Sequence, residues 1–128
     1  MLATADAVAN VAVKDLETAR LFYQDTLGLK PIHRQEGEVI VFRSGNSQLN
    51  VYRSQYAGTN RATAVTWNVG PELDTLVRDL KSKGVRFEHY NIPGLKVEGD
   101  IHSAGEMKVA WFKDPDGNIL NLINQSEQ

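Results

Sequence analysis

The sequence predicts an α+β fold made of two tandem β-α-β-β-β modules. Short runs in which apolar and polar residues alternate, as in half-buried strands, recur along the chain, and one helical pattern follows the first strand of each half. Residues at equivalent places in the two halves are separated by the same 56 positions. These pairs are Val13 and Val69, Gly28 and Gly84, and His33 and His89. A constant offset of this kind indicates an internal duplication.

The first module is predicted over residues 7–52. Residues 7–13 alternate as a strand, Asp15 is placed to cap a helix, and Gly28 is placed to end that helix in a left-handed conformation. Two further strands, "EVIVFRSG" and "SQLNVYR", are joined by a turn at Gly45.

The second module is predicted over residues 63–125. It repeats the pattern with a strand at 64–69 and an amphipathic helix that ends at Gly84. The stretch 109–123 predicts a hairpin, because its "DPDG" sequence suits a type I turn followed by a glycine bulge.

A long loop and a short joint complete the predicted organisation. Residues 90–107 are rich in Gly, Pro and polar residues, which predicts a functional or mobile loop whose part near 95–101 pairs as a strand. The polar joint 53–62 is short, so we interpret residues 1–128 as a single domain containing both modules.

Composition and charge exclude several classes of function. The net charge of −2 gives no electrostatic basis for binding nucleic acid or an anionic membrane. No apolar run is long enough to span a bilayer, and "MLATADAVAN" lacks the basic start and apolar core of a signal peptide. The absence of cysteine rules out disulfides, thiol catalysis and thiolate metal ligands, and it fits a cytoplasmic protein.

Two motifs, "DLETARLFYQDTLGL" and "WFKDPDGNILNLI", together with the paired modules, resemble the vicinal oxygen chelate superfamily. That family includes glyoxalase I, extradiol dioxygenases, fosfomycin-modifying enzymes and bleomycin-binding resistance proteins. The resemblance covers nearly the whole chain and implies curved sheets around a cleft, a small-molecule ligand and a homodimer. Its motifs form a helix cap, a helix core and a hairpin turn, so they indicate the fold and not the activity.

In the metal-dependent proteins that this chain resembles, four cavity-facing His, Gln or Glu side chains hold a divalent ion. Transferred by motif position, the first ligand falls on Val8, its equivalent in the second module on Ala64, and the last on Asn121. The remaining ligand falls on Gln48 or Asn50, depending on the strand register. Valine and alanine cannot ligate, and a neutral asparagine is a weak donor for a transition metal. The resemblance therefore implies a glyoxalase-like, bleomycin resistance-like member that is metal-free, with no cofactor.

Strand alternation places small and polar side chains on the faces opposite the helices. We expect these side chains to converge on one cavity that binds a small molecule, with residues 90–107 over its mouth. Two aromatic residues that flank this loop are expected to stack on a flat ligand. The predicted ligand-binding residues are Asn10, Asn50, Tyr52, Thr66, Asn68, Tyr90, Trp111 and Asn121. The alternative is that the asparagines satisfy one another, or water, inside a filled cavity.

Asp100, His102 and Glu106 bring a histidine and carboxylates together in the sequence. If residues 100–102 are extended, Asp100 and His102 face the same way, and His102 is a candidate general base oriented by the carboxylate. We prefer the simpler interpretation of a solvated polar loop. Two other histidines, His33 and His89, are expected at outer strand edges and not as a metal pair.

Three functions remain open at this point. The preferred one is metal-free small-molecule binding, as in drug-sequestering resistance proteins, because a shaped cleft suffices and an acidic protein tolerates a cationic ligand. The alternative is a metal-independent lyase, isomerase or glyoxalase-like enzyme that uses His102, Asp100 or Tyr52. The third is a partner-binding accessory protein with a vestigial cleft.

Overall fold

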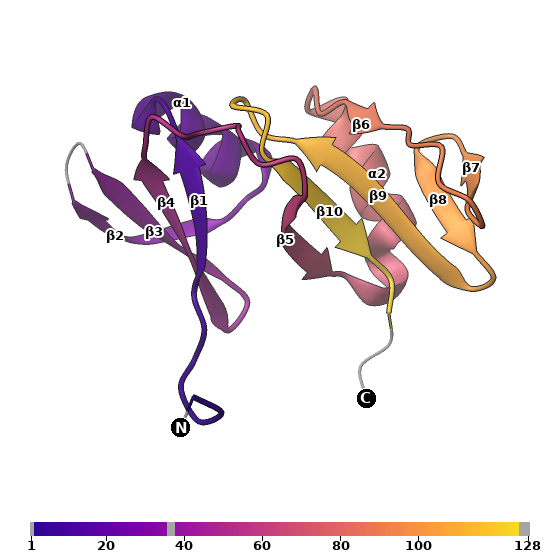
Figure 1. Ribbon diagram of the computed structural model, residues 1–128, viewed down its shortest axis with the longest axis horizontal. Helices are drawn as coiled ribbons and strands as arrows, with labels where there is room; N and C mark the ends of the chain where they lie inside the picture. The colour runs from indigo at the N-terminus through magenta and orange to yellow at the C-terminus, as the bar shows by residue number, and fades with distance from the viewer. Residues whose placement is uncertain (1, 36–37, 126–128) are drawn as a thin grey trace. The chain divides into compact units, whose positions relative to one another are not determined.

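The computed structural model of the protein describes residues 2–35 and 38–125 (Figure 1). The chain forms two compact units, Met1–Thr59 and Asn60–Gln128, and the boundary between them falls inside the predicted joint. Each unit is a mixed sheet with a helix packed against it, which confirms the predicted α+β class. None of the helices in the described residues is long and apolar enough to cross a membrane.

The sheet of the first unit has the strand order β1-β4-β3-β2. In this sheet β1 and β4 run parallel, whereas β4–β3 and β3–β2 are antiparallel pairs. The elements in chain order are β1 (Ala9–Val13), α1 (Leu16–Arg20), η1 (Leu21–Thr26), β2 (Lys30–Gln35), β3 (Val39–Ser44) and β4 (Ser47–Arg53). The order of strands and helix is the predicted β-α-β-β-β module.

The first helix begins where the sequence predicts. The Asp15 carboxylate accepts hydrogen bonds from the Glu17 amide at 3.2 Å and from the Thr18 hydroxyl at 2.7 Å. These bonds, the Thr18 bond foremost, lower the pKa of Asp15. The sequence did not predict the change from α-helical to wider π-helical turns after Arg20. Gly28 then turns the chain toward β2 with a φ of 78°.

The sheet of the second unit has the order β5-β10-β9-β8-β7, and β6 pairs with β9 as well. Its first and last strands, β5 and β10, run parallel, as β1 and β4 do. The elements are β5 (Thr63–Asn68), η2 (Gly70–Glu72), α2 (Leu73–Ser82), β6 (Phe87–Glu88), β7 (Lys96–Glu98), β8 (Ile101–Ala104), β9 (Met107–Lys113) and β10 (Ile119–Ile123). The predicted strand near 95–101 is thus a short hairpin of β7 and β8.

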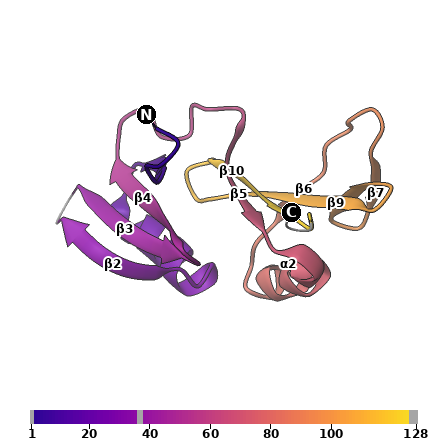
Figure 2. The same ribbon diagram turned by 90° about the horizontal axis from the view of Figure 1, so that it is seen from below.

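The second unit departs from the first at one strand position. Both β6 and β8 pair with β9, β6 at Trp111 and Phe112 and β8 at residues 107–109. The chain between these two strands leaves the sheet after β6 and rejoins it at the edge as β7, which pairs with β8. Figure 2 shows that α2 covers one face of this sheet and that the stretch between β6 and β7 rises on the opposite face.

The hairpin between β9 and β10 has the predicted turn. The Gly117 amide donates to the Asp114 carbonyl and the Asp114 amide to the Asn118 carbonyl, each at 3.0 Å, and Gly117 has a φ of 91°. The Asp114 carboxylate, only 5% exposed, accepts bonds from the Asp116 and Asn118 amides and from the Asn118 side chain. This network fixes the register in which β10 returns along β9.

Candidate functional site

The predicted site residues of the first unit lie on adjacent strands. Asn10 and Asn50 are register partners, and the Asn50 side-chain amide donates to the Asn10 side-chain oxygen Oδ1 at 3.2 Å. The Asn10 side-chain nitrogen Nδ2 also donates to the backbone carbonyl of Val8 at 3.4 Å. Tyr52 follows on the same face, opposite Ala12, and is 38% exposed. For Asn10 and Asn50, the structure agrees with the alternative interpretation, in which the asparagines form hydrogen bonds with one another.

The register also resolves which first-unit residue corresponds to Asn121. Asn50 pairs with Asn10 on the parallel strand β1, and Asn121 pairs with Thr66 on the parallel strand β5. Thr66 lies 56 positions after Asn10, the offset that relates the two modules. Asn50, and not Gln48, is therefore the counterpart of Asn121.

The residues at the transferred ligand positions do not fit a divalent metal ion. Val8 precedes the first residue of β1 and Ala64 lies on β5, and neither side chain carries a donor atom. Asn50 and Asn121 contribute only neutral amides, which hold transition metals poorly. Among residues 2–35 and 38–125, no three His, Cys, Asp or Glu side chains are grouped in a way that would hold an ion.

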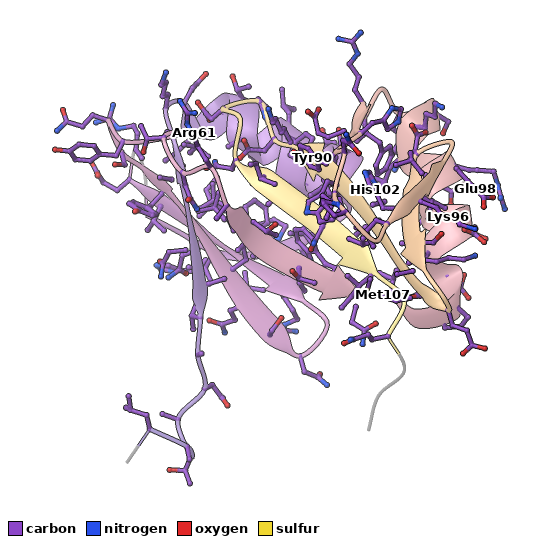
Figure 3. The ribbon with its side chains drawn as sticks, turned by 45° about the vertical axis from the view of Figure 1, so that its right-hand side comes forward. Arg61, Tyr90, Lys96, Glu98, His102 and Met107 are labelled. Atoms are coloured by element: carbon purple, nitrogen blue, oxygen red, sulfur yellow. The ribbon has the colours of Figure 1, made fainter. Side chains whose placement is uncertain are left out.

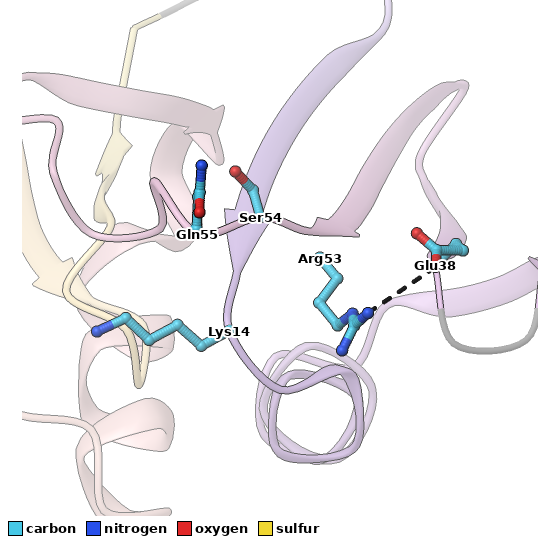
Figure 4. Close-up of a pocket in the computed structure, with 5 residues that line it drawn as sticks. All are labelled: Lys14, Glu38, Arg53, Ser54 and Gln55. Carbon is cyan, nitrogen blue, oxygen red and sulfur yellow. Dashed lines mark ion pairs between the residues drawn. The ribbon is translucent and has the colours of Figure 1, made fainter.

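An open pocket of about 400 Å³ lies on the first unit (Figure 4). Its lining residues are Lys14, Glu38, Arg53, Ser54 and Gln55. The Arg53 guanidinium and the Glu38 carboxylate are 4.0 Å apart, and both side chains are more than half exposed. None of the predicted site residues lines this pocket, and every side chain that lines it is polar or charged.

The predicted residues of the second unit share one face of its sheet. Asn121 on β10 is the register partner of Trp111 on β9 and of Thr66 on β5, and cross-strand partners point to the same side. Asn68 follows two residues after Thr66 on that side. Phe112 and Leu120 occupy the opposite face, where they are fully buried. We refer to the face that carries Trp111 and Asn121 as the polar face.

Three rings pack together on the polar face. His102 on β8 pairs with Val109, two residues before Trp111, and its ring lies edge-on to the indole with a centroid distance of 4.9 Å. Tyr90, from the segment after β6, lies 5.3 Å from Trp111 and 6.1 Å from His102 by ring centroids. Figure 3 shows Tyr90 and His102 as neighbours in front of the strands of the second sheet. We call Tyr90, His102 and Trp111 the aromatic cluster.

The aromatic cluster and Asn121 contain buried polar atoms without partners. No hydrogen-bond partner among the described residues reaches the Tyr90 hydroxyl, the His102 Nδ1 or the Asn121 Oδ1. His102 is 0% and Asn121 8% exposed. Burying a polar group without a partner costs free energy, so such atoms are rare in native proteins and call for a specific explanation.

Burial around the aromatic cluster also affects the Tyr90 phenol. Its pKa is raised above the ordinary value, first by burial and then by the negative charge of Glu88. Glu88 is the register partner of Trp111, so it shares the polar face, and it forms an ion pair with Lys113 at 3.7 Å. The phenol therefore keeps its proton and can both donate and accept a hydrogen bond.

Asp100 does not orient His102. Its two carboxylate oxygens contact the Lys81 amine at 2.9 Å and the His89 Nε2 at 2.8 Å. The His102 Nε2 instead accepts a hydrogen bond from the Tyr90 amide at 2.8 Å. The prediction that these residues form a solvated polar loop is wrong for His102, because the β7–β8 hairpin and Tyr90 enclose it.

The other histidines and Glu106 are not part of the cluster. His33 and His89 are exposed, as expected for outer positions. The Glu106 carbonyl accepts a bond from the Asn124 side chain, which ties the turn before β9 to the end of β10. The burial of His102 was missed at the sequence level, although "IHSAGEMKVAW" alternates around Gly105 as a hairpin that aligns His102 with the face of Trp111.

Comparison with known proteins agrees with this fold. A sequence model described as the Glyoxalase/Bleomycin resistance protein/Dioxygenase superfamily matches residues 5–122. No curated protein matches the sequence.

Several solved structures share the fold at low sequence identity. An antibiotic binding protein from a Streptomyces species is 22% identical, with a TM-score of 0.69 and 99% of each chain covered. Lactoylglutathione lyase from Agrobacterium tumefaciens is 18% identical, with a TM-score of 0.71, over 94% of this chain and 92% of that one. The fosfomycin resistance protein FosX from Listeria monocytogenes is 16% identical, with a TM-score of 0.72, over 98% and 94%. At these identities the likeness concerns the fold alone.

Proposed function

This chain belongs to the glyoxalase/bleomycin resistance protein/dioxygenase superfamily, and on that premise we propose that it binds a small molecule without the metal ion of its metal-dependent relatives. The antibiotic binding protein with the same fold supports this class of function. Sequestration needs a shaped surface and hydrogen-bond partners, and no reacting group.

One observation carries the proposal. The Tyr90 hydroxyl, the His102 Nδ1 and the Asn121 Oδ1 are buried around the Trp111 indole, and none has a partner among the described residues. Aromatic walls with a few convergent polar atoms are typical of ligand sites. A bound molecule that satisfies these atoms removes the cost of burying them, and this gain favours binding.

The observations favour binding over catalysis by His102. A general base needs a free lone pair aimed at the proton it removes. The Nε2 lone pair of His102 is already used by the Tyr90 amide, and no carboxylate in residues 2–35 and 38–125 is bonded to the ring. Asp100, the other catalytic candidate, is bound to Lys81 and His89. The alternative of a metal-independent lyase or isomerase therefore gains no support from this geometry.

The first prediction concerns ligand-induced stabilisation. A compound that occupies the polar face at roughly 100 times its Kd adds about 2.7 kcal/mol to the free energy of unfolding. For a chain of this size, we expect the melting temperature to rise by several degrees in a thermal-shift screen of small molecules. Asn121→Leu and Trp111→Phe should reduce the shift that such a compound causes.

Variants of the first unit locate the site. A shift that depends on Arg53 and not on Asn121 would place the ligand in the open pocket of the first unit. A shift that needs Tyr52 as well as Asn121 would support the predicted cavity that residues of both units share. A diverse library without any compound that stabilises the protein would contradict the binding function and favour the accessory-protein hypothesis.

The remaining parts of the proposal follow from the family resemblance and from composition. We retain a homodimer as the expected assembly, and a cytoplasmic location in keeping with the absence of cysteine. The net charge of −2 makes nucleic acid and anionic membranes unsuitable partners.

A further inference from the structure

A hydrogen bond to one ring nitrogen of His102 determines which ring nitrogen carries the proton. The Tyr90 amide donates to Nε2 at 2.8 Å, so this nitrogen carries a lone pair. A neutral imidazole has its single proton on the other nitrogen, which makes Nδ1–H a donor. That donor is buried and has no partner among the described residues.

Asn121 supplies an acceptor on the other side of the same indole. It lies on β10 and His102 on β8, while Trp111 lies on β9 between them. Asn121 is the direct register partner of Trp111, and the His102 ring touches the indole edge-on. The Asn121 Oδ1 is buried and has no partner in the part of the chain that the structure describes. A donor and an acceptor therefore flank one aromatic surface.

The electrostatic character of this surface favours an uncharged ligand. The carboxylate that shares the polar face, Glu88, is paired with Lys113. The register partners of His102 are Val97 and Val109, and those of Asn121 are Thr66 and Trp111; none of these side chains carries a charge. An ion placed there would lose its hydration without gaining a counter-charge, which is costly.

Tyr90 occupies the space over the indole in this structure. It belongs to the stretch between β6 and β7, on the face of the sheet opposite α2 (Figure 2). Its ring packs edge-on to Trp111 at 5.3 Å, and its hydroxyl is buried without a partner. A ligand that packs on the indole in the place of this ring has to displace it.

Resting on the proposed function, we infer that the polar face takes a planar, uncharged ligand that carries both a hydrogen-bond acceptor and a hydrogen-bond donor, as a lactam or an imide does. Its carbonyl oxygen accepts from the His102 Nδ1–H, and its N–H donates to the Asn121 Oδ1. Its ring takes the place of the Tyr90 ring against Trp111. This arrangement satisfies both buried atoms and frees the Tyr90 hydroxyl to reach water.

Three bicyclic probes separate the parts of this inference. 2-Quinolone carries the adjacent carbonyl and N–H, 1-methyl-2-quinolone keeps the carbonyl but lacks the N–H, and quinoline lacks both. We expect 2-quinolone to bind at least roughly tenfold more tightly than either analogue, as the loss of one or two hydrogen bonds requires. The measurement is a titration of isotope-labelled protein followed by the indole N–H signals in two-dimensional NMR.

The two tryptophans make the readout local. Trp111 lies on the polar face, and Trp67 stacks on Phe112 on the helix side of the sheet. The Trp111 signal, identified by its loss in Trp111→Phe, should move on titration while the Trp67 signal stays. A probe that moves both signals equally would overturn the assignment of the site.

Variants test each contact separately. His102→Phe and Asn121→Leu keep the packing volume and should each weaken 2-quinolone binding roughly tenfold. Asn46→Leu, in the exposed turn between β3 and β4, is the matched control and should bind as the parent does. Tyr90→Ala should bind more tightly than the parent, because no ring has to be displaced. Weaker binding by Tyr90→Ala would overturn the displacement.

The experiment distinguishes failure of this inference from failure of the proposed function. If 1-methyl-2-quinolone or quinoline binds as tightly as 2-quinolone, the presence of both a donor and an acceptor does not define the ligand. If no lactam binds but another library compound moves the Trp111 signal, the ligand class is wrong and the binding function stands. If no compound moves that signal and none stabilises the protein in the thermal-shift screen, both are wrong.

Discussion

The side-chain oxygen and NH2 group of an asparagine on a strand both need hydrogen-bond partners. In this protein, asparagines at similar strand positions differ in whether the oxygen has one. Asn10 and Asn50 bond to each other. The Asn68 oxygen accepts from the Gly70 amide at 3.2 Å. Asn121 alone of these four is buried with an unpartnered oxygen. Residue type and strand alternation were sufficient to place each pair on one face of its own sheet, but not to tell structural amides from a binding one.

Asp114 provides a test of hairpin stability at the scale of one residue. Replacing it with Ala leaves two amides and the Asn118 side chain without their acceptor in a buried turn. We expect Asp114→Ala to lower the free energy of unfolding by about 2–3 kcal/mol in urea denaturation. Asp79→Ala, an exposed aspartate on α2, is the control and should change it by less than about 0.5 kcal/mol. Equal effects of the two variants would contradict this role of Asp114.

His102 shows why part of the candidate site escaped prediction. Its neighbours in sequence are polar, and the stretch around it is rich in glycine, so local composition indicated a solvated loop. Its burial comes from Tyr90, which is distant along the chain and reaches it through the hydrogen bond to Nε2. Contacts of this kind depend on the path of an irregular segment, which strand alternation does not determine.

At the scale of elements, ion pairs and a hydrogen bond hold the two ends of the segment from His89 to Asp100. His89 and Asp100, at its two ends, pair at 2.8 Å, and Lys81 on α2 joins the same carboxylate. The Tyr90 amide bonds to His102 beside them. The stretch that covers the aromatic cluster is therefore held at both ends while its tip is exposed.

Acidification should remove the stabilisation that the ion pairs of Asp100 with Lys81 and His89 provide. Hydrogen bonds from Lys81 and His89 hold the pKa of Asp100 below its usual value, near 3.9 in an unfolded chain. The unfolded state then binds the proton more readily, so the stabilisation is complete above about pH 3.9 and is lost as the pH falls through the lower folded pKa. We expect Asp100→Asn to be less stable than the parent by up to about 1 kcal/mol at pH 6, and equally stable at strongly acid pH.

Denaturation curves across this pH range provide the measurement. Asp74→Asn, whose carboxylate pairs with Lys108 on the surface at 3.4 Å, is the matched control for loss of an ion pair. A difference between Asp100→Asn and the parent that stays constant down to strongly acid pH would show that the charge of Asp100 is not responsible.

The elements themselves were largely predictable, because capping, alternation and turn residues are local signals. Asp15, Gly28 and Gly117 act where the sequence placed them. Two short strands, β6 and β8, pair with successive parts of β9, and this was not predictable. The pairing brings together segments that are separated by a long irregular stretch of chain. The same holds for the π-helical turns after Arg20, for which the apolar spacing of a helix gives no signal.

At the scale of the whole molecule, the transferred ligand positions predict the metal content. Val8 and Ala64 lack donor atoms, and Asn121 offers a neutral amide where metal-dependent relatives keep a carboxylate. Protein incubated with nickel, zinc or manganese and then desalted should retain no stoichiometric ion by elemental analysis. A metal-dependent member of the superfamily, treated in parallel, is the control. One retained ion per chain would contradict the transfer of these positions.

The constant offset of 56 residues correctly indicated two modules of like topology. In each unit the first strand pairs in parallel with the last, which pairs antiparallel with the strand before it. That the two modules superpose by a twofold axis, and that residues of both reach one cavity, remain predictions. Hydrophobic patterns specify each sheet, whereas the placement of two sheets depends on contacts that such patterns do not encode.

The segment between β6 and β8 also has a consequence for the evolution of such a protein. Both strands are held by neighbouring stretches of β9, so the chain leaves the sheet and returns beside the point of departure. An insertion anchored in this way can be lengthened, shortened or replaced while the framework keeps its pairing, much as antibody loops diversify on a constant scaffold. Descendants of this chain can therefore inherit the fold unchanged and acquire a new ligand through a dozen or so residues.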